Sequence, residues 1–183
     1  MKAQEYHTYP APLDEEIGTA LSYFPQLQNV KISFKFKTDI KKSTMQAQPR
    51  FLSLFRSKSN REYYIFISEK FKISGQEFKT VNVPSDVIIG WIGHELGHIM
   101  DYENRGSLNL IWFGIRYLLV EKHIVEAERA ADTYAVNQGM EDYIIKTKNF
   151  ILNHADIDEN YKNRIKRFYL SPEEIMQIVE ERN

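Results

Sequence analysis

The sequence contains no cysteine among its 183 residues. Disulfide bonds and cysteine-ligated zinc sites are therefore excluded, and any metal site must use histidine nitrogens and carboxylate oxygens. Residues 1–7 lack the apolar core of a secretory signal, which favours a cytoplasmic protein. No internal repeat, low-complexity tract or linker interrupts the chain, so we expect residues 1–183 to form a single domain.

Long apolar runs are also missing. The most apolar stretch, residues 110–120, has about half of the ~20 residues that a membrane-spanning helix needs. We expect a helix folded back on the domain, with Trp112, Phe113 and Leu119 at least partly buried and Arg116 reaching solvent. Membrane contact or a homo-oligomer through residues 110–120 is the alternative, and we expect it only if the apolar face is open.

A charge asymmetry underlies the net charge of −1. Residues 26–80 contain 12 lysines and arginines but only 4 aspartates and glutamates, so they carry +8 and the rest of the chain carries −9. A solvated, lysine-rich face of a sheet explains this pattern, and a surface for an acidic partner is the alternative. We expect no nucleic-acid partner.

The chemistry concentrates in the segment Gly93–His98, which reads H-E-x-x-H from His94 onward. Two histidines four residues apart lie one turn apart on the same face of a helix, so His94 and His98 are able to bind one metal ion together. Glu95 lies beside them and is placed to accept a proton from water on the open side of the metal. The motif therefore predicts Zn²⁺ bound by His94 and His98, with Glu95 as general base.

The residues around the motif indicate that its helix is buried. Residues 87–92 are mostly apolar, and two histidines and a glutamate on a buried helix need polar partners or a metal. Gly90, Gly93 and Gly97 lie along one stripe, and each glycine costs about 1 kcal/mol relative to alanine in a helix. We expect another backbone to approach this stripe closely, and that neighbour to be the element that supplies a third ligand.

A catalytic zinc site needs a third protein ligand. The remaining candidates are His7, His123, His154, Glu121, Glu126, Glu128 and Asp132. Ile124, Glu128, Ala131 and Ala135 share one face of the predicted helix at 121–138, and its alanines would let it press against the glycine stripe. This phasing favours Glu128 as the ligand. Asp132, one turn further on, is placed to accept a hydrogen bond from a ligand imidazole.

These residues carry a resemblance to a known family. The segments 94–98 and 128–132 resemble the H-E-x-x-H…E-x-x-A-D pattern of gluzincin metallopeptidases. They are most similar to the M48 group, which includes the CaaX prenyl protease, the HtpX-like membrane peptidases and their small soluble relatives. The resemblance implies zinc on His94, His98 and Glu128. It also implies a small sheet whose edge strand holds the substrate in extended form.

The chain departs from that family in two respects. It has no full transmembrane helices, and Asp158 stands where membrane-bound relatives often have a histidine, six residues before an arginine that matches Arg164. The group that stabilises the transition-state oxyanion is therefore unassigned. The candidates are His154, Tyr161 and Arg164.

The distribution of patterns predicts an α+β fold, with a small N-terminal mixed β-sheet packed on a mostly helical C-terminal half, and the resemblance to gluzincins implies that this fold is zincin-like. Residues 30–37 alternate between apolar and polar, as in a half-buried strand, and residues 63–68 are apolar on both faces, as in a central strand. Residues 43–48 are a third candidate strand. A helix is expected from Ser85 or Asp86, either of which is a suitable cap.

Zinc-dependent hydrolysis of a peptide or protein substrate is the function that these patterns favour. The alternative is a gluzincin-like protein that binds zinc without peptidase activity and acts as a regulator or scaffold. The departure at Asp158 supports this alternative.

Overall fold

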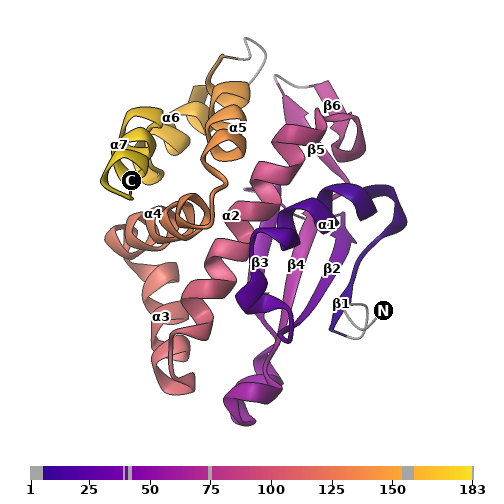
Figure 1. Cartoon of the computed structure of the whole chain (residues 1–183), viewed down its shortest axis with the longest axis vertical. Coiled ribbons are helices and arrows are strands. Elements are labelled where there is room, and N and C mark those ends of the chain that lie inside the picture. Colours follow the sequence, from indigo (N-terminus) through magenta and orange to yellow (C-terminus); the bar gives the residue numbers. More distant parts are fainter. Residues whose placement is uncertain (1–5, 39, 41–42, 74–75, 154–158, 183) are drawn as a thin grey trace.

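The computed structural model describes residues 6–38, 40, 43–73, 76–153 and 159–182. It confirms the α+β class: a small mixed sheet lies on one side of a long central helix, and further helices lie on the other side (Figure 1). The helices are α1 (Asp14–Ser22), α2 (Ser85–Glu103), α3 (Ser107–Leu119), α4 (Glu121–Asn137), α5 (Glu141–Asn153), α6 (Glu159–Phe168) and α7 (Pro172–Arg182).

The main sheet has the strand order β1-β2-β4-β3, and a separate antiparallel hairpin joins β5 to β6. The strands are β1 (His7–Thr8), β2 (Lys31–Lys37), β3 (Met45–Pro49), β4 (Glu62–Ser68), β5 (Lys70–Ile73) and β6 (Gln76–Lys79). The pairs β1–β2 and β2–β4 are parallel, whereas β3 runs antiparallel to β4 and forms an edge of the sheet. Residues 63–68 are therefore central, as predicted.

The two faces of the sheet are covered differently. Ile32, Ile65 and Ile67 point into the core beneath helices α1 and α2. On the other face, the Nζ atoms of Lys35 and Lys37 lie 4.8 and 5.0 Å from the ring centroids of Tyr64 and Phe66. The lysine stems thus cover the second apolar face of β4, which explains how this strand is apolar on both faces without a second helical layer.

Helix α2 begins at Ser85, but neither predicted cap is used. The Ser85 hydroxyl donates instead to Glu16 Oε1 at 2.9 Å, and Asp86 accepts a hydrogen bond from Lys146 Nζ at 2.6 Å. Both side chains bind residues that are distant in the sequence instead of capping the helix. The helix start is therefore held by packing between α1, α2 and α5 more than by a local cap.

The glycine stripe of α2 is a close contact with two helices. A Cβ atom at Gly97 would overlap the backbone of Ala131 on α4, and a Cβ atom at Gly90 would overlap the backbone of Tyr143 on α5. A Cβ atom at Gly93 would meet the Met140 side chain between those helices. The expectation of a close backbone is confirmed, and α4, which carries Glu128, is one of the two neighbours.

Helix α3 differs from the prediction for residues 110–120. Leu110 is buried and Phe113 is half-buried, but Trp112 is 62% exposed and Leu119 is 78% exposed. The expectation of burial is therefore wrong for Trp112 and Leu119, because no neighbouring element among the described residues covers that face of the helix. Arg116 is exposed, as predicted. Among the described helices, none has the length and apolar character needed to cross a membrane.

Candidate metal centre

Three side chains from two packed helices converge on one point. The Nε2 atom of His94 lies 3.0 Å from Glu128 Oε2, and the Nε2 atom of His98 lies 3.5 Å from the same oxygen. The ligand atoms of these residues all lie within 4.8 Å of one another, and all three side chains are buried. The group formed by His94, His98 and Glu128 could therefore hold a metal ion.

The other ring nitrogen of His94 is held by a buried carboxylate. Asp132 Oδ1 lies 2.9 Å from His94 Nδ1, while Asp132 Oδ2 accepts hydrogen bonds from Lys148 Nζ at 2.7 Å and from the Leu170 N–H at 3.0 Å. Asp132 is only 1% exposed. Asp132 thus binds the His94 ring nitrogen opposite the one that contacts Glu128, which is the predicted hydrogen bond to this imidazole, and it fixes the orientation of the ring. His98 Nδ1, in contrast, has no hydrogen-bond partner among the described residues.

Charges near the site favour ionised carboxylates. Burial opposes the ionisation of Asp132 and Glu128, but Lys148 and His94 near Asp132, and both histidines near Glu128, outweigh it and lower both pKa values. Burial also opposes protonation of His94, but its hydrogen bonds to Asp132 and Glu128 raise its pKa above the usual range. The ligand group therefore presents negative oxygen to the point where a cation would lie.

Glu95 connects the histidine helix to the edge strand. Its Oε2 atom accepts a hydrogen bond of 2.5 Å from the Ala47 N–H on β3, and the Tyr102 hydroxyl donates to the Ala47 carbonyl at 3.3 Å. Thr44 and Arg50 pair with β4, so by the alternation of an antiparallel ladder Ala47 directs its backbone groups outward. Glu95 thus links the helix that carries His94 and His98 to the outward side of the edge strand.

The site opens into a cavity of about 660 Å³ between β3 and helices α2 to α6. Tyr161 and Arg164, both predicted to lie near the oxyanion, line the same cavity as His94, His98 and Glu128. The Tyr161 side chain interacts with Thr44 near the start of β3. The third candidate, His154, lies outside the described residues.

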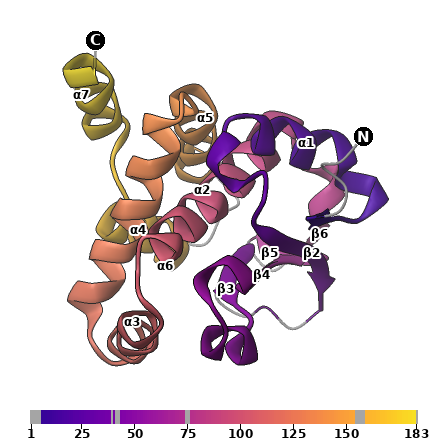
Figure 2. The same ribbon diagram turned by 60° about the horizontal axis from the view of Figure 1, so that its bottom comes forward.

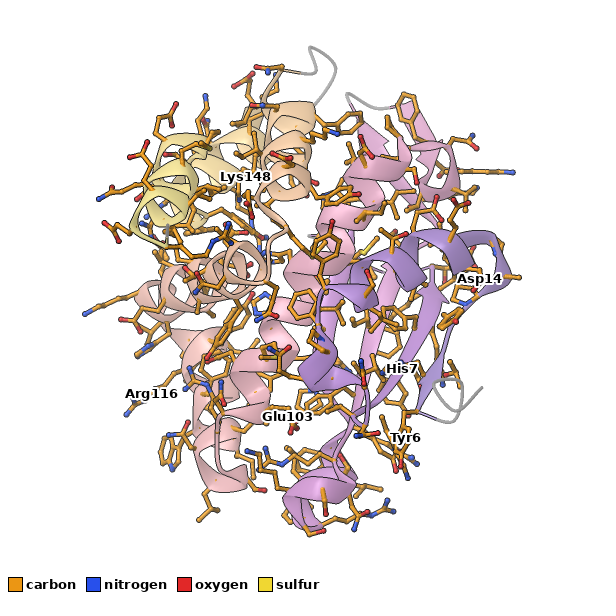
Figure 3. The ribbon with its side chains drawn as sticks, in the orientation of Figure 1. Tyr6, His7, Asp14, Glu103, Arg116 and Lys148 are labelled. Carbon is orange, nitrogen blue, oxygen red and sulfur yellow. The ribbon has the colours of Figure 1, made fainter. Side chains whose placement is uncertain are left out.

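The structure adds two residues that the sequence analysis did not single out. The Tyr117 hydroxyl on α3 donates to Glu128 Oε1 at 2.6 Å, and Lys148 on α5 reaches Asp132 through the interior between α4 and α5 (Figure 3). Tyr117 is a polar side chain inside the apolar stretch 110–120, which is a signal that sequence reasoning could have used. Lys148 carries no such signal, because its burial depends on how α5 packs against α2 and α4.

Comparison of the chain with protein-family models, with curated proteins and with solved structures finds no match.

Proposed function

We propose that this protein is a zinc-dependent peptidase of the gluzincin type with a zincin-like fold. The observation that carries the proposal is the position of Glu95, which lies beside two metal-binding histidines and is hydrogen-bonded to the outward edge of β3. A carboxylate in that position faces both the metal ligands and the place where an extended peptide would pair with the sheet.

Zinc fits the donor set. Ligands on a tetrahedral zinc at ~2.0–2.1 Å lie roughly 3.3 Å from one another. The two nitrogen-to-oxygen distances of 3.0 and 3.5 Å bracket that value. Two imidazoles and one carboxylate, with a fourth side open to a cavity, are also the ligand set of several catalytic zinc sites.

Each side chain then has a role in peptide hydrolysis. When bound, the metal supplies a Lewis acid that polarises the scissile carbonyl and acidifies water. Glu95 takes a proton from the attacking water as its oxygen bonds to the carbonyl carbon, and returns that proton to the amine nitrogen as the C–N bond breaks. Burial raises the pKa of Glu95, which moves this carboxylate toward the range in which a general base works best.

The edge strand supplies the substrate-binding surface. The outward backbone groups of Ala47 would pair with an extended peptide once Glu95 and Tyr102 release them. Pro49, two residues on, has no N–H to offer, so pairing on this side ends there. Arg164 and Tyr161, which line the same cavity as β3, are the candidates for stabilising the oxyanion.

The decisive experiment compares the wild-type protein with Glu95→Gln on a diverse peptide library, with cleavage sites read by mass spectrometry and zinc content by elemental analysis. We expect one zinc per chain in both proteins and a loss of cleavage by roughly 100-fold or more in the variant. Wild-type protein that holds one zinc and cleaves no peptide would instead identify a zinc-binding regulator or scaffold.

A second comparison tests the ligand set. Glu128→Ala should lower the affinity for zinc by roughly tenfold or more, because it removes one of three ligands. His123→Ala is the control, since His123 bonds to Glu126 on the outer side of the same helix. Full zinc binding by Glu128→Ala would show that the assignment is wrong.

A further inference from the structure

The exposed apolar side chains of this protein gather at one end. Of the 11 large apolar residues in the described chain with substantial exposure, nine belong to two elements. The 3-10 helix η4 (Phe51–Phe55) contributes Phe51, Leu52 and Phe55, which are 62–70% exposed. The other six lie on α3 and its C-cap, and they are Leu108, Trp112, Ile115, Leu118, Leu119 and Val120. We call these nine residues the η4–α3 surface.

The two elements are held at the same end of the molecule. Arg61, which follows η4 by six residues, is buried and donates to the Arg105 carbonyl at 2.8 Å and to the Ser107 hydroxyl at 3.1 Å, at the start of α3. Figures 1 and 2 both place the segment that contains η4 and helix α3 at the lower end of the molecule, on either side of the end of α2. The two elements that carry the exposed apolar residues therefore lie at the same end of the molecule.

The charges within this region have one sign. Residues 50–60 and 107–120 contain Arg50, Arg56, Lys58 and Arg116 but no aspartate or glutamate. Glu62, just beyond the first segment, pairs with both Arg50 and Arg56, and Glu121, just beyond the second, pairs with Arg167, so the region keeps an excess of positive charge. Arg116 extends from the outer side of α3, away from the body of the molecule (Figure 3). The region therefore combines large apolar side chains with cations, which suits an anionic surface.

A second copy of the chain fits this surface poorly. A two-fold dimer places the same patch on both subunits, so the cations of one copy would face those of the other. A lipid bilayer with anionic headgroups provides both an apolar interior for Trp112 and its neighbours and a negative layer for Arg116 and Lys58. The 13 residues of α3 are about 20 Å long, too short to cross a hydrocarbon core of ~30 Å, but sufficient to lie along its interface.

We propose that the η4–α3 surface docks the protein on anionic membranes, with α3 lying in the plane of the bilayer surface. Leu118 is 81% exposed and also lines the cavity, so docking would set the cavity mouth against the lipid headgroups. If the proposed function holds, the substrates are peptides that emerge from or lie along a membrane surface. Docking itself requires no peptide hydrolysis, so the two proposals are tested separately.

The experiment measures co-sedimentation of the Glu95→Gln protein with phosphatidylcholine vesicles, with or without about one third phosphatidylserine. We expect binding to the anionic vesicles that weakens as salt increases. The double variant Trp112→Ser with Phe55→Ser should lower the partition coefficient roughly tenfold or more. The matched control is Val81→Ser with Met176→Ser. It removes the two large exposed apolar side chains of the described chain that lie outside the η4–α3 surface, and this variant should bind the vesicles as before.

Fluorescence gives an independent readout of the same contact. Trp91 is buried and Trp112 is exposed, so quenching by brominated lipid should report on Trp112 alone and should vanish in Trp112→Phe, which still binds. Thermal melting shows that each variant folds. No binding to either vesicle, or equal binding of the Glu95→Gln protein with and without Trp112→Ser/Phe55→Ser, overturns the proposal. A concentration-dependent dimer that the same variant abolishes assigns the surface to a second copy and also overturns it.

Discussion

Helices α2 and α3 follow one another in the chain and are both rich in large apolar residues, yet they have opposite environments. Helix α2 buries 15 of its 19 residues, whereas α3 buries only Leu110 of its 13. Helix α2 is enclosed by α1, α4, α5 and β3, while α3 packs mainly on α4. Apolar composition alone therefore indicates a helix, but it does not tell whether the helix has neighbours on every side.

Glycine distinguishes the two helices. Gly90 and Gly97 on α2 face the backbones of α5 and α4 at distances that leave no room for a Cβ atom, and Gly93 faces the end of the Met140 side chain. Gly114 on α3 has no atom of another element within 4 Å of the place where a Cβ would lie. A glycine in a helix costs stability wherever it lies, but only on α2 does close packing of helices compensate for that cost.

The largest effect on stability is expected among the buried residues packed around α2, at Lys148. Lys148→Met leaves the carboxylate of Asp132 buried without its cation, which should destabilise the protein by about 3–5 kcal/mol in urea unfolding. Lys146→Met is the control on the same helix, because the Lys146–Asp86 pair is about half exposed and should contribute less than ~1 kcal/mol. Equal effects of the two substitutions would contradict the assignment of a buried network.

A smaller effect on stability should distinguish Gly97 on α2 from Gly114 on α3. Gly97→Ala forces a Cβ against the Ala131 backbone and should cost about 1–3 kcal/mol in the same measurement. Gly114→Ala meets no neighbour and should stabilise the protein by about 0.5–1 kcal/mol, because alanine is the better helix former. A destabilising Gly114→Ala would show that α3 has a close neighbour in solution.

The smallest effect concerns the hydrogen bond between Tyr117 on α3 and Glu128 in the candidate metal centre. Tyr117→Phe removes the hydrogen bond to Glu128 Oε1 and should weaken zinc binding roughly tenfold, as measured by competition with a chelator. Tyr134→Phe on α4 is the control, because its hydroxyl bonds to Asn104 at the surface. Unchanged affinity in Tyr117→Phe would mean that α3 contributes nothing to the site.

The part of the site that follows helical periodicity could be predicted from the sequence. His94 and His98 lie on one face of α2, Glu128 on the facing side of α4 and Asp132 one turn beyond, and the structure brings these four residues together. Fixed helical geometry makes such spacings informative without any knowledge of the tertiary structure. The α+β class and the central position of residues 63–68 follow in the same way from local patterns.

The remaining features depend on packing between distant elements. Lys148 and the Leu170 N–H reach Asp132 only because α5 and the connection between α6 and α7 fold against α4. Ser85 and Asp86 have the composition of helix caps, but Glu16 and Lys146 bind them instead. No local pattern encodes these partners, and for the same reason residues 110–120 could not reveal that Trp112 lacks a covering element.

The edge strand β3 has a consequence for solubility. An exposed edge with free backbone groups is a template on which further strands add, so it promotes aggregation. Here Glu95 and Tyr102 hold the outward N–H and carbonyl of Ala47, and Pro49 removes one more donor. The same contacts that place Glu95 beside the histidines therefore also protect the strand against self-assembly into extended sheets.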